Sequence, residues 1–185
     1  MTDLEICNMA LSFHGKSITQ DQLTSESNIE AKNCALYLPV AKKRCISEFD
    51  WSFFTKKLYI DYSDSQEGFG YRNSFKLPYG TVKVIPQERN DYSYRVLNGR
   101  IYTNEEEPEV WGINEDCMED TEYPEEFDYL VAFSLGFLLC SVLSPSDQIL
   151  LQNCLNQFTW TKKQLVEKEA LSNYRDLGTE EQEIR

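Results

Sequence analysis

The sequence predicts an α+β protein that is mainly helical with a β-rich insertion: a bundle of about four helices plus a small antiparallel sheet. Apolar residues lie mainly along one side of a helix in three segments, residues 4–13, 27–49 and 145–175, and residues 125–143 form a fourth helical segment that is apolar on nearly every side of its second half. Residues 71–117 instead show a period of two and are rich in Tyr, Val and Ile, which favours strands. We therefore expect a helical part from residues 1–60 and 124–176, an insertion at 71–117 and a flexible tail at 177–185.

The composition is that of a folded protein rather than a disordered one. Of 185 residues, 41% are apolar and 13% aromatic, which is enough to build a hydrophobic core. The net charge of −13 argues against non-specific binding of nucleic acid, because neutralising phosphates needs a basic face. Residues 1–5 lack the basic and apolar regions of a signal peptide.

The six cysteines do not form a recognisable metal or redox motif. None of them makes a C-x-x-C pair, and most lie among apolar residues of the expected helices: Cys7, Cys34, Cys45, Cys117, Cys140 and Cys154. This pattern predicts buried, reduced thiols in a protein made in the cytosol, rather than a disulfide framework.

The first predicted helix, at residues 4–13, has recognisable ends. Thr2 and Asp3 can cap its start, and Gly15 suits the position that follows its last turn. We expect residues 17–24 to form a connecting loop.

The second predicted helix begins near Ser25 or Ser27 and ends near Phe49, and Ser27 and Glu30 have the Ser-x-x-Glu spacing of a capping box. Pro39 lies inside the pattern and is expected to kink or split the helix. The apolar positions expected to face the core are Ile29, Cys34, Leu36, Leu38, Ala41, Cys45, Ile46 and Phe49.

The third predicted helix, from about residue 125 to 143, is apolar on nearly every side of its second half and must be surrounded by protein or lipid. Its run of about 14 apolar residues is shorter than the roughly 20 that span a bilayer. We therefore expect a central core helix.

The fourth predicted helix is expected to start with Ser144 as N-cap and Pro145 as its first residue. If it continues to Arg175, it is about 30 residues and roughly 45 Å long. That exceeds what a small domain needs, so its far end should contact another molecule. The side expected to face the core carries Ile149, Leu150, Leu151, Cys154, Leu155, Phe158 and Leu165.

Within the β region, the clearest signal is a hairpin of residues 92–97 and 100–103 around Asn98-Gly99, a pair that tolerates the positive φ angles of a tight turn. Further strands are expected near residues 75–78, 81–85 and 109–113. Ahead of this region, Trp51, Phe53 and Phe54 could form an aromatic binding site. Burial at the junction of the second helix and the sheet is favoured, because aromatic rings bury large areas where elements meet.

Few residues suggest catalysis. His14, the only histidine, lies at an expected helix end, where a cationic imidazole would be stabilised by the helix dipole. One histidine and scattered cysteines make zinc or a Ser–His or Cys–His centre improbable. Carboxylates cluster at 105–107 and again from Glu115 to Glu126, without the spacing of an EF-hand. We expect solvated acidic loops and no catalytic, cofactor or metal site.

Several motifs occur in a defined order along residues 1–175. They are Leu11-Ser-Phe-His-Gly15, Cys34 with Arg44 and Ile46 before Asp50-Trp-Ser-Phe53, Phe75-Lys-Leu-Pro78 with Val82 and Val84, Tyr94 to Thr103, and Tyr123 to Phe127 with Leu130, Ala132 and Leu135. Their order and spacing resemble the head–tail adaptor (connector) proteins of short-tailed bacteriophages, the tail tubular protein A-like family. The sequence departs from that pattern at Tyr79-Gly80, where the family usually has an acidic residue.

The resemblance implies a virion structural protein without enzymatic activity, assembled in the host cytoplasm and located at the neck or tail. Its members form a ring, usually of twelve copies, between the portal protein and other tail or nozzle proteins. Double-stranded DNA passes through the lumen during ejection without specific binding, and neither a cofactor nor a membrane is implied. In this setting we expect the C-terminal region to dock on the portal through Tyr174, Arg175, Leu177 and Ile184.

Two other functions remain open from the sequence. One is a peptidoglycan-degrading glycosidase of the virion that uses acidic residues around 105–126, because such enzymes need two carboxylates across a cleft. The other is a generic helical protein-interaction module that forms no ring. Cell-wall zymography tests the first alternative, and binding to a portal ring separates the second from an adaptor.

Overall fold

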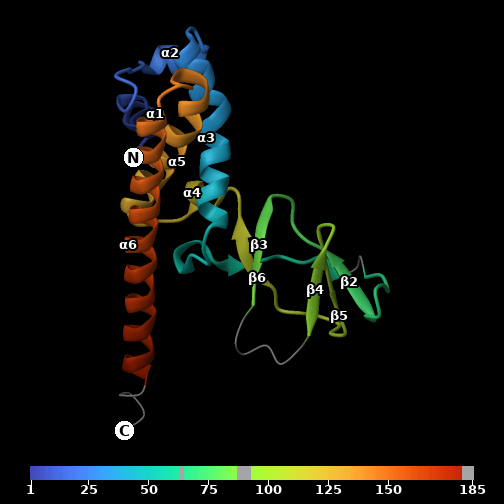
Figure 1. Cartoon of the computed structure of the whole chain (residues 1–185). Helices are drawn as coiled ribbons and strands as arrows, with labels where there is room; N and C mark the ends of the chain where they lie inside the picture. The colour runs from blue at the N-terminus through green and yellow to red at the C-terminus, as the bar shows by residue number, and fades with distance from the viewer. Residues whose placement is uncertain (63–64, 87–92, 181–185) are drawn as a thin grey trace. The chain divides into compact units, whose positions relative to one another are not determined.

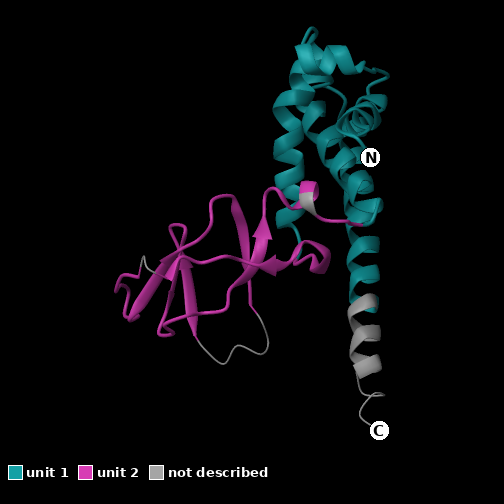
Figure 2. Ribbon diagram, turned by 180° about the vertical axis from the view of Figure 1, so that it is seen from behind, with its two compact units in different colours: residues 1–49, 124–185 teal, residues 50–123 magenta. Residues whose placement is uncertain are grey.

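A computed structural model describes residues 1–62, 65–86 and 93–180, without the side chains of residues 120 and 172–180. In these residues the chain forms six α-helices and two small antiparallel sheets, so the α+β prediction is confirmed (Figure 1). The chain divides into two compact units (Figure 2). Unit 1 contains residues 1–49 and 124–185, and unit 2 contains residues 50–123. Residues 50–60, expected in the helical part, therefore belong to unit 2.

Unit 1 begins with α1 (Asp3–Ser12) and α2 (Gln20–Ser25). Thr2 caps α1 through a capping box with Glu5. The loop predicted at residues 17–24 is wrong in part, because α2 occupies most of it. Thr19 and Gln22 form a capping box that starts this short helix.

The next helix, α3 (Ile29–Ser47), starts differently from the prediction. Asn28 is the N-cap and accepts a hydrogen bond from the Ala31 N–H at 2.7 Å. The predicted capping box of Ser27 and Glu30 is wrong, since Glu30 instead accepts from Lys16 at 2.5 Å.

Pro39 does not split α3, which continues on both sides of it as one helix. The buried side of α3 carries Ala31, Cys34, Leu38, Ala41, Cys45 and Ile46. Ile29 and Leu36, expected in the core, are instead exposed.

Helix α5 (Glu126–Leu143) is the central helix of unit 1 and packs against α1, α3 and α6. Phe127, Leu130, Val131, Leu135 and Leu139 are fully buried along it. Among the described helices, it alone is long and apolar enough to cross a membrane. Its contacts with three other helices are those of the core helix predicted from the sequence.

Helix α6 (Gln148–Glu180) has 33 residues. The predicted start at Ser144 and Pro145 is wrong: Ser144 ends α5, and the Asp147 side chain accepts from the Leu150 N–H at 2.9 Å, as an N-cap does. One side of α6 is buried, through Cys154, Phe158, Thr161, Leu165 and Glu169. Ile149 and Leu151, expected in the core, are exposed.

Unit 2 contains two three-stranded antiparallel sheets. In the first, β6 (Trp111–Asn114) lies between β1 (Lys56–Lys57) and β3 (Thr81–Ile85). In the second, β5 (Arg100–Thr103) lies between β2 (Asn73–Lys76) and β4 (Tyr94–Leu97). The other regular elements of the unit are the 3₁₀ helix η1 (Ser52–Phe54) and α4 (Cys117–Asp120).

The β4–β5 turn confirms the predicted hairpin. Asn98 and Gly99 have φ angles of 52° and 70°, the positive values that a two-residue hairpin turn requires. Residue 92, the first residue of the predicted hairpin strand 92–97, lies outside the described residues. The apolar side chains of both sheets share one core, made of Leu58, Ile60, Phe75, Leu77, Ile101 and Val110 with Val84 and Tyr94 beside it.

Candidate functional site

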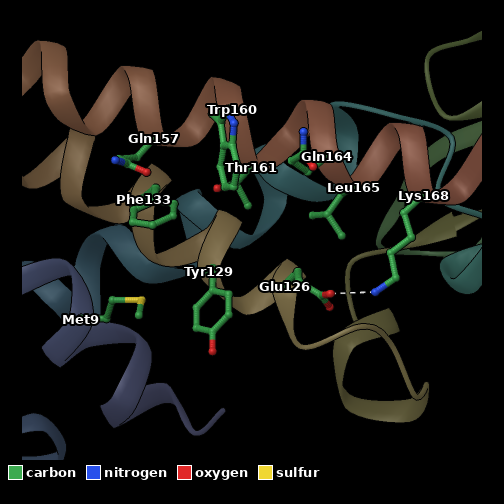
Figure 3. A pocket seen from close by; sticks show the side chains of 10 residues that line it. All are labelled: Met9, Glu126, Tyr129, Phe133, Gln157, Trp160, Thr161, Gln164, Leu165 and Lys168. Carbon is green, nitrogen blue, oxygen red and sulfur yellow. Dashed lines mark hydrogen bonds and ion pairs between the residues drawn. The ribbon is translucent and has the colours of Figure 1, made fainter.

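Unit 1 has a largely apolar groove of about 550 Å³ between α1, α5 and α6 (Figure 3). Met9 of α1 lies along one wall with Tyr129 and Phe133 of α5, and α6 supplies the other wall. Phe133 is held by ring contact with Phe13, with the centroids 5.7 Å apart. The complete lining is Met9, Glu126, Tyr129, Phe133, Gln157, Trp160, Thr161, Gln164, Leu165 and Lys168.

Trp160 is the largest side chain of the groove and is 62% exposed. Thr161 and Leu165 beside it belong to the buried side of α6, so Trp160 stands at the border between that side and solvent. An indole in this position offers a large apolar face and one N–H donor, the combination that is enriched at the centres of protein interfaces.

An ion pair closes one end of the groove. Lys168 Nζ donates to Glu126 Oε1 at 2.7 Å, linking α6 to the first turn of α5. Its partner Lys168 lowers the pKa of the Glu126 carboxyl. Glu126 is therefore an ionised carboxylate at the edge of the groove. It does not have the raised pKa that a general acid needs.

Three exposed apolar residues follow one line along α6: Ile149, Trp160 and Leu171. They are spaced by eleven residues, which is close to three full helical turns, so their side chains leave the helix in nearly the same direction. We call this set the outer stripe of α6. Exposed apolar residues are normal when scattered, but an aligned set on one helix is typical of a surface that meets another protein.

Helix α6 also continues beyond the helix it packs on. Lys168 lies beside the first turn of α5, and α6 extends twelve residues further, to Glu180. At 1.5 Å per residue this part is about 18 Å long. Tyr174, Arg175 and Leu177, predicted to dock on a portal, belong to it, but their side chains lie outside the described residues. The fourth predicted residue, Ile184, also lies outside them.

The acidic residues proposed for a glycosidase lie mainly in exposed loops and ion pairs. Glu105, Glu106 and Glu107 are exposed, Lys57 pairs with Glu109 at 3.0 Å, and Lys56 pairs with Asp116 at 3.6 Å. No group of three potential metal ligands occurs among the residues that the structure describes. This arrangement gives no positive support to the glycosidase alternative.

His14 does not act as the cationic helix cap that the sequence predicts. Its Nδ1 lies 3.0 Å from Ser144 Oγ, which joins the end of α1 to the end of α5. Burial lowers the pKa of the imidazole, with the Gly136 backbone offsetting part of the effect. The imidazole is therefore neutral at neutral pH. Its partner Ser144 is 130 positions away, so sequence spacing could not reveal the contact.

The aromatic and thiol side chains are mostly internal. Trp51 and Phe54 are fully buried, so they do not form an exposed aromatic binding site. All six cysteines are buried and free, and Cys140 and Cys154 bring their sulfurs to 4.0 Å between α5 and α6. Burial raises the pKa of Cys45, of Cys117 and of Cys154 to about 12, so these thiols are protonated and unreactive at neutral pH.

A second concave surface, of about 960 Å³, lies on unit 2 and was not predicted. Tyr59 and Tyr79 line it with 90% and 95% of their surface exposed, beside Lys76 and Arg100. Sequence reasoning missed this surface because a tyrosine in a β region is usually half-buried. The one available signal was Tyr79-Gly80, where the chain departs from the family pattern that it otherwise resembles.

Comparison with known proteins does not assign a family or a function to this chain. No protein-family model matches the chain, and no curated protein matches it significantly. The function is therefore argued from the groove, the outer stripe of α6 and the extension of this helix beyond α5.

Proposed function

We propose that this chain is a phage virion structural protein, a head-to-tail adaptor that forms a ring joining the portal to the tail. The observation that carries the proposal is the asymmetry of α6. This helix of 33 residues is buried along one side only, bears an apolar stripe on its outer side, and continues past the start of α5. A helix with these properties is suited to contact a second protein rather than to complete its own core.

In this proposal α1, α3, α5 and α6 act together as a four-helix bundle that builds the wall of the ring. Support comes from α5, which packs against the other three helices, and from α1, which also packs against α3. A closed ring is made by a head-to-tail interface of two different patches, repeated around the axis. Twelve copies are expected, as in the family that the sequence resembles.

The adaptor would dock on the portal through the end of α6 and the region beyond it, with Tyr174, Arg175, Leu177 and Ile184 as contact residues. The groove beside Trp160 lies on the same helix and would take apolar side chains of the partner. The net charge of −13 suits a channel for DNA, because a negative wall repels phosphates and lets the duplex pass without sticking.

Sedimentation of the full chain with purified portal rings of the same virus tests this function. We expect co-sedimentation of the wild-type chain and at least about tenfold weaker binding by Trp160→Ala, since an exposed aromatic anchor at an interface contributes about 2 kcal/mol or more. Leu36→Ala is the matched control. Leu36 is also 62% exposed but lies on α3, away from the groove and the outer stripe, so its loss should leave binding unchanged.

Two results would contradict the proposal. If the wild-type chain does not bind a portal ring, the generic interaction module becomes the better description. If Trp160→Ala and Leu36→Ala both bind as well as the wild type, the adaptor does not use this side of α6.

A further inference from the structure

The concave surface of unit 2 and the acidic loop of the same unit have complementary chemistry. The surface presents Tyr59 and Tyr79, almost fully exposed, together with Lys76, Asp61 and Arg100. The guanidinium of Arg100 already donates to the Ser74 hydroxyl at 3.2 Å and to the Ser74 carbonyl at 2.8 Å, so Lys76 is the cation that a ligand would meet first. Lys76 is exposed and has no ion-pair partner among the described residues. In a chain of net charge −13, a site with two cations and one carboxylate stands out as a place for an acidic ligand.

The acidic loop is residues 104–107, in which Glu105, Glu106 and Glu107 are consecutive and exposed. Its backbone is held in place by hydrogen bonds at the start of the loop. Asn73 Nδ2 donates to the Glu105 carbonyl at 2.9 Å, and the Glu105 N–H donates to Thr103 Oγ1 at 3.2 Å. A loop held in this way loses little conformational entropy when it binds.

The two features lie at opposite ends of one β ladder. In the β2–β5 pair, Lys76 is opposite Arg100 at one end, and Asn73 is opposite Thr103 at the other, directly before the acidic loop. Three strand steps separate these ends by about 10 Å. The acidic loop and the tyrosine surface of one chain therefore lie at opposite ends of this ladder.

We propose that the tyrosine surface of unit 2 binds the acidic loop of a second copy of this chain. The contact pairs Lys76 with a glutamate of the neighbour, with the positive charge of Arg100 nearby, while Tyr59 and Tyr79 cover the backbone of the neighbour's loop. It joins two different patches, so repetition produces a head-to-tail series of subunits, which closes into a ring if the rotation allows. This inference deepens the proposed function and rests on it for the closed ring, although the pairwise contact itself does not require a portal.

A zero-length carbodiimide cross-linker tests the contact, because it joins a lysine amine to a carboxylate only when they touch. Unlabelled and ¹⁵N-labelled full chains are mixed, with and without portal rings, cross-linked and analysed by mass spectrometry. We expect light-to-heavy links between Lys76 and the peptide that contains Glu105, Glu106 and Glu107. Chains that stay monomeric under both conditions, or that assemble and cross-link elsewhere but not here, would overturn the inference.

Charge reversal gives a second, independent readout. Lys76→Glu should weaken association of the chains by about five- to tenfold, because it places like charges in contact. Adding Glu106→Lys to the same chain should recover most of the loss. Lys32→Glu, the same charge change at an exposed position of α3 in unit 1, is the control and should have no effect. The contact would also be overturned if Lys76→Glu associates as well as the Lys32→Glu control and the double variant associates no better than Lys76→Glu.

These outcomes separate the two proposals. If the chains bind a portal ring without the cross-link at Lys76, the adaptor function stands and the tyrosine surface has another role. If the cross-link forms but no portal ring is bound, the contact between copies stands and the adaptor function falls.

Discussion

At the scale of single residues, the most informative positions are those whose partners lie far away in the chain. His14 contacts Ser144, which is 130 positions away. The contact between Cys140 and Cys154 is closer in the chain but also joins two different helices. The sequence predicted that the cysteines are buried, since apolar neighbours indicate burial whatever the partner. It could not predict the neutral state of His14, because that depends on how α1 and α5 pack. The exposure of Tyr59 and Tyr79 was hidden for the same reason.

The partly buried imidazole of His14 predicts a pH dependence of stability. Burial lowers the pKa of His14 in the folded chain below its ordinary value of 6.5, so the unfolded chain takes up the proton first as the pH falls. Stability contributed by the neutral ring is complete above pH 6.5 and is lost as the pH falls from there through the folded-state pKa.

Urea unfolding at pH 7.5 and pH 5.5 measures this effect. The wild type should lose more stability between the two values than His14→Asn, which keeps a polar side chain toward Ser144 but does not titrate. Equal losses in the two chains would contradict a partly buried His14 that is neutral in the folded state.

The raised thiol pKa values predict slow chemistry. In the folded chain at pH 8, we expect Ellman's reagent to label less than one thiol rapidly, because all six cysteines are buried and Cys45, Cys117 and Cys154 also have pKa values of about 12. In guanidinium chloride all six cysteines should react. Four or fewer thiols in the unfolded, unreduced chain would instead indicate disulfides.

At the scale of elements, the sequence predicted helices and strands correctly where the conformation depends on neighbouring residues in the chain. The Asn98-Gly99 turn and strand β3 were predicted because their residue types and alternation favour them locally. The two-residue strand β1 was missed because it forms only by pairing with β6, more than fifty positions away. Helix α2 was missed although Thr19 and Gln22 carry a local capping signal, and Asn28 displaced Ser27 as the cap of α3.

The core side of α6 was only partly predicted. Cys154, Phe158 and Leu165 are buried as expected, but Ile149 and Leu151 are exposed. Apolar residues occur on more than one side of this helix, and the sequence alone does not say which side meets α5. The exposed apolar residues of α6 are the ones that suggest a function, because they do not contribute to the buried side of this helix.

Gly112 in β6 offers a test of how tightly the first sheet is packed. A Cβ at this position would lie 2.8 Å from Leu58 Cδ1 and would clash with the Lys83 backbone carbonyl of β3. Gly112→Ala should therefore destabilise unit 2 by about 2 to 3 kcal/mol, as overpacking in a core does.

Gly70→Ala is the matched control for this substitution. Gly70 has a positive φ of 84°, but a Cβ at this position would have no neighbouring atom within 4 Å, so only backbone strain of about 1 kcal/mol is expected. Chemical denaturation followed by tryptophan fluorescence compares the two variants. The close packing around Gly112 would be contradicted if its substitution cost no more than that of Gly70.

At the scale of the whole molecule, the change of periodicity within the chain predicted that a β region interrupts a helical one. The structure adds two features that periodicity cannot give: how far α6 continues beyond α5, and which surfaces of each unit remain uncovered. Unit 1 offers the groove and the outer stripe of α6, and unit 2 offers the tyrosine surface and the acidic loop. Both units thus carry surfaces suited to association, and association rather than catalysis is the activity we propose.

The measurement that tests this account most directly is the affinity for a portal ring of the chain shortened to residues 1–171. This truncation leaves the groove, the outer stripe and every described core residue in place, so thermal unfolding should be nearly unchanged. If the end of α6 grips the portal, the shortened chain should bind at least about a hundredfold more weakly than the full chain, a loss of about 3 kcal/mol. Equal binding by the two chains would contradict the claim that the extension of α6 beyond α5 exists to hold another protein.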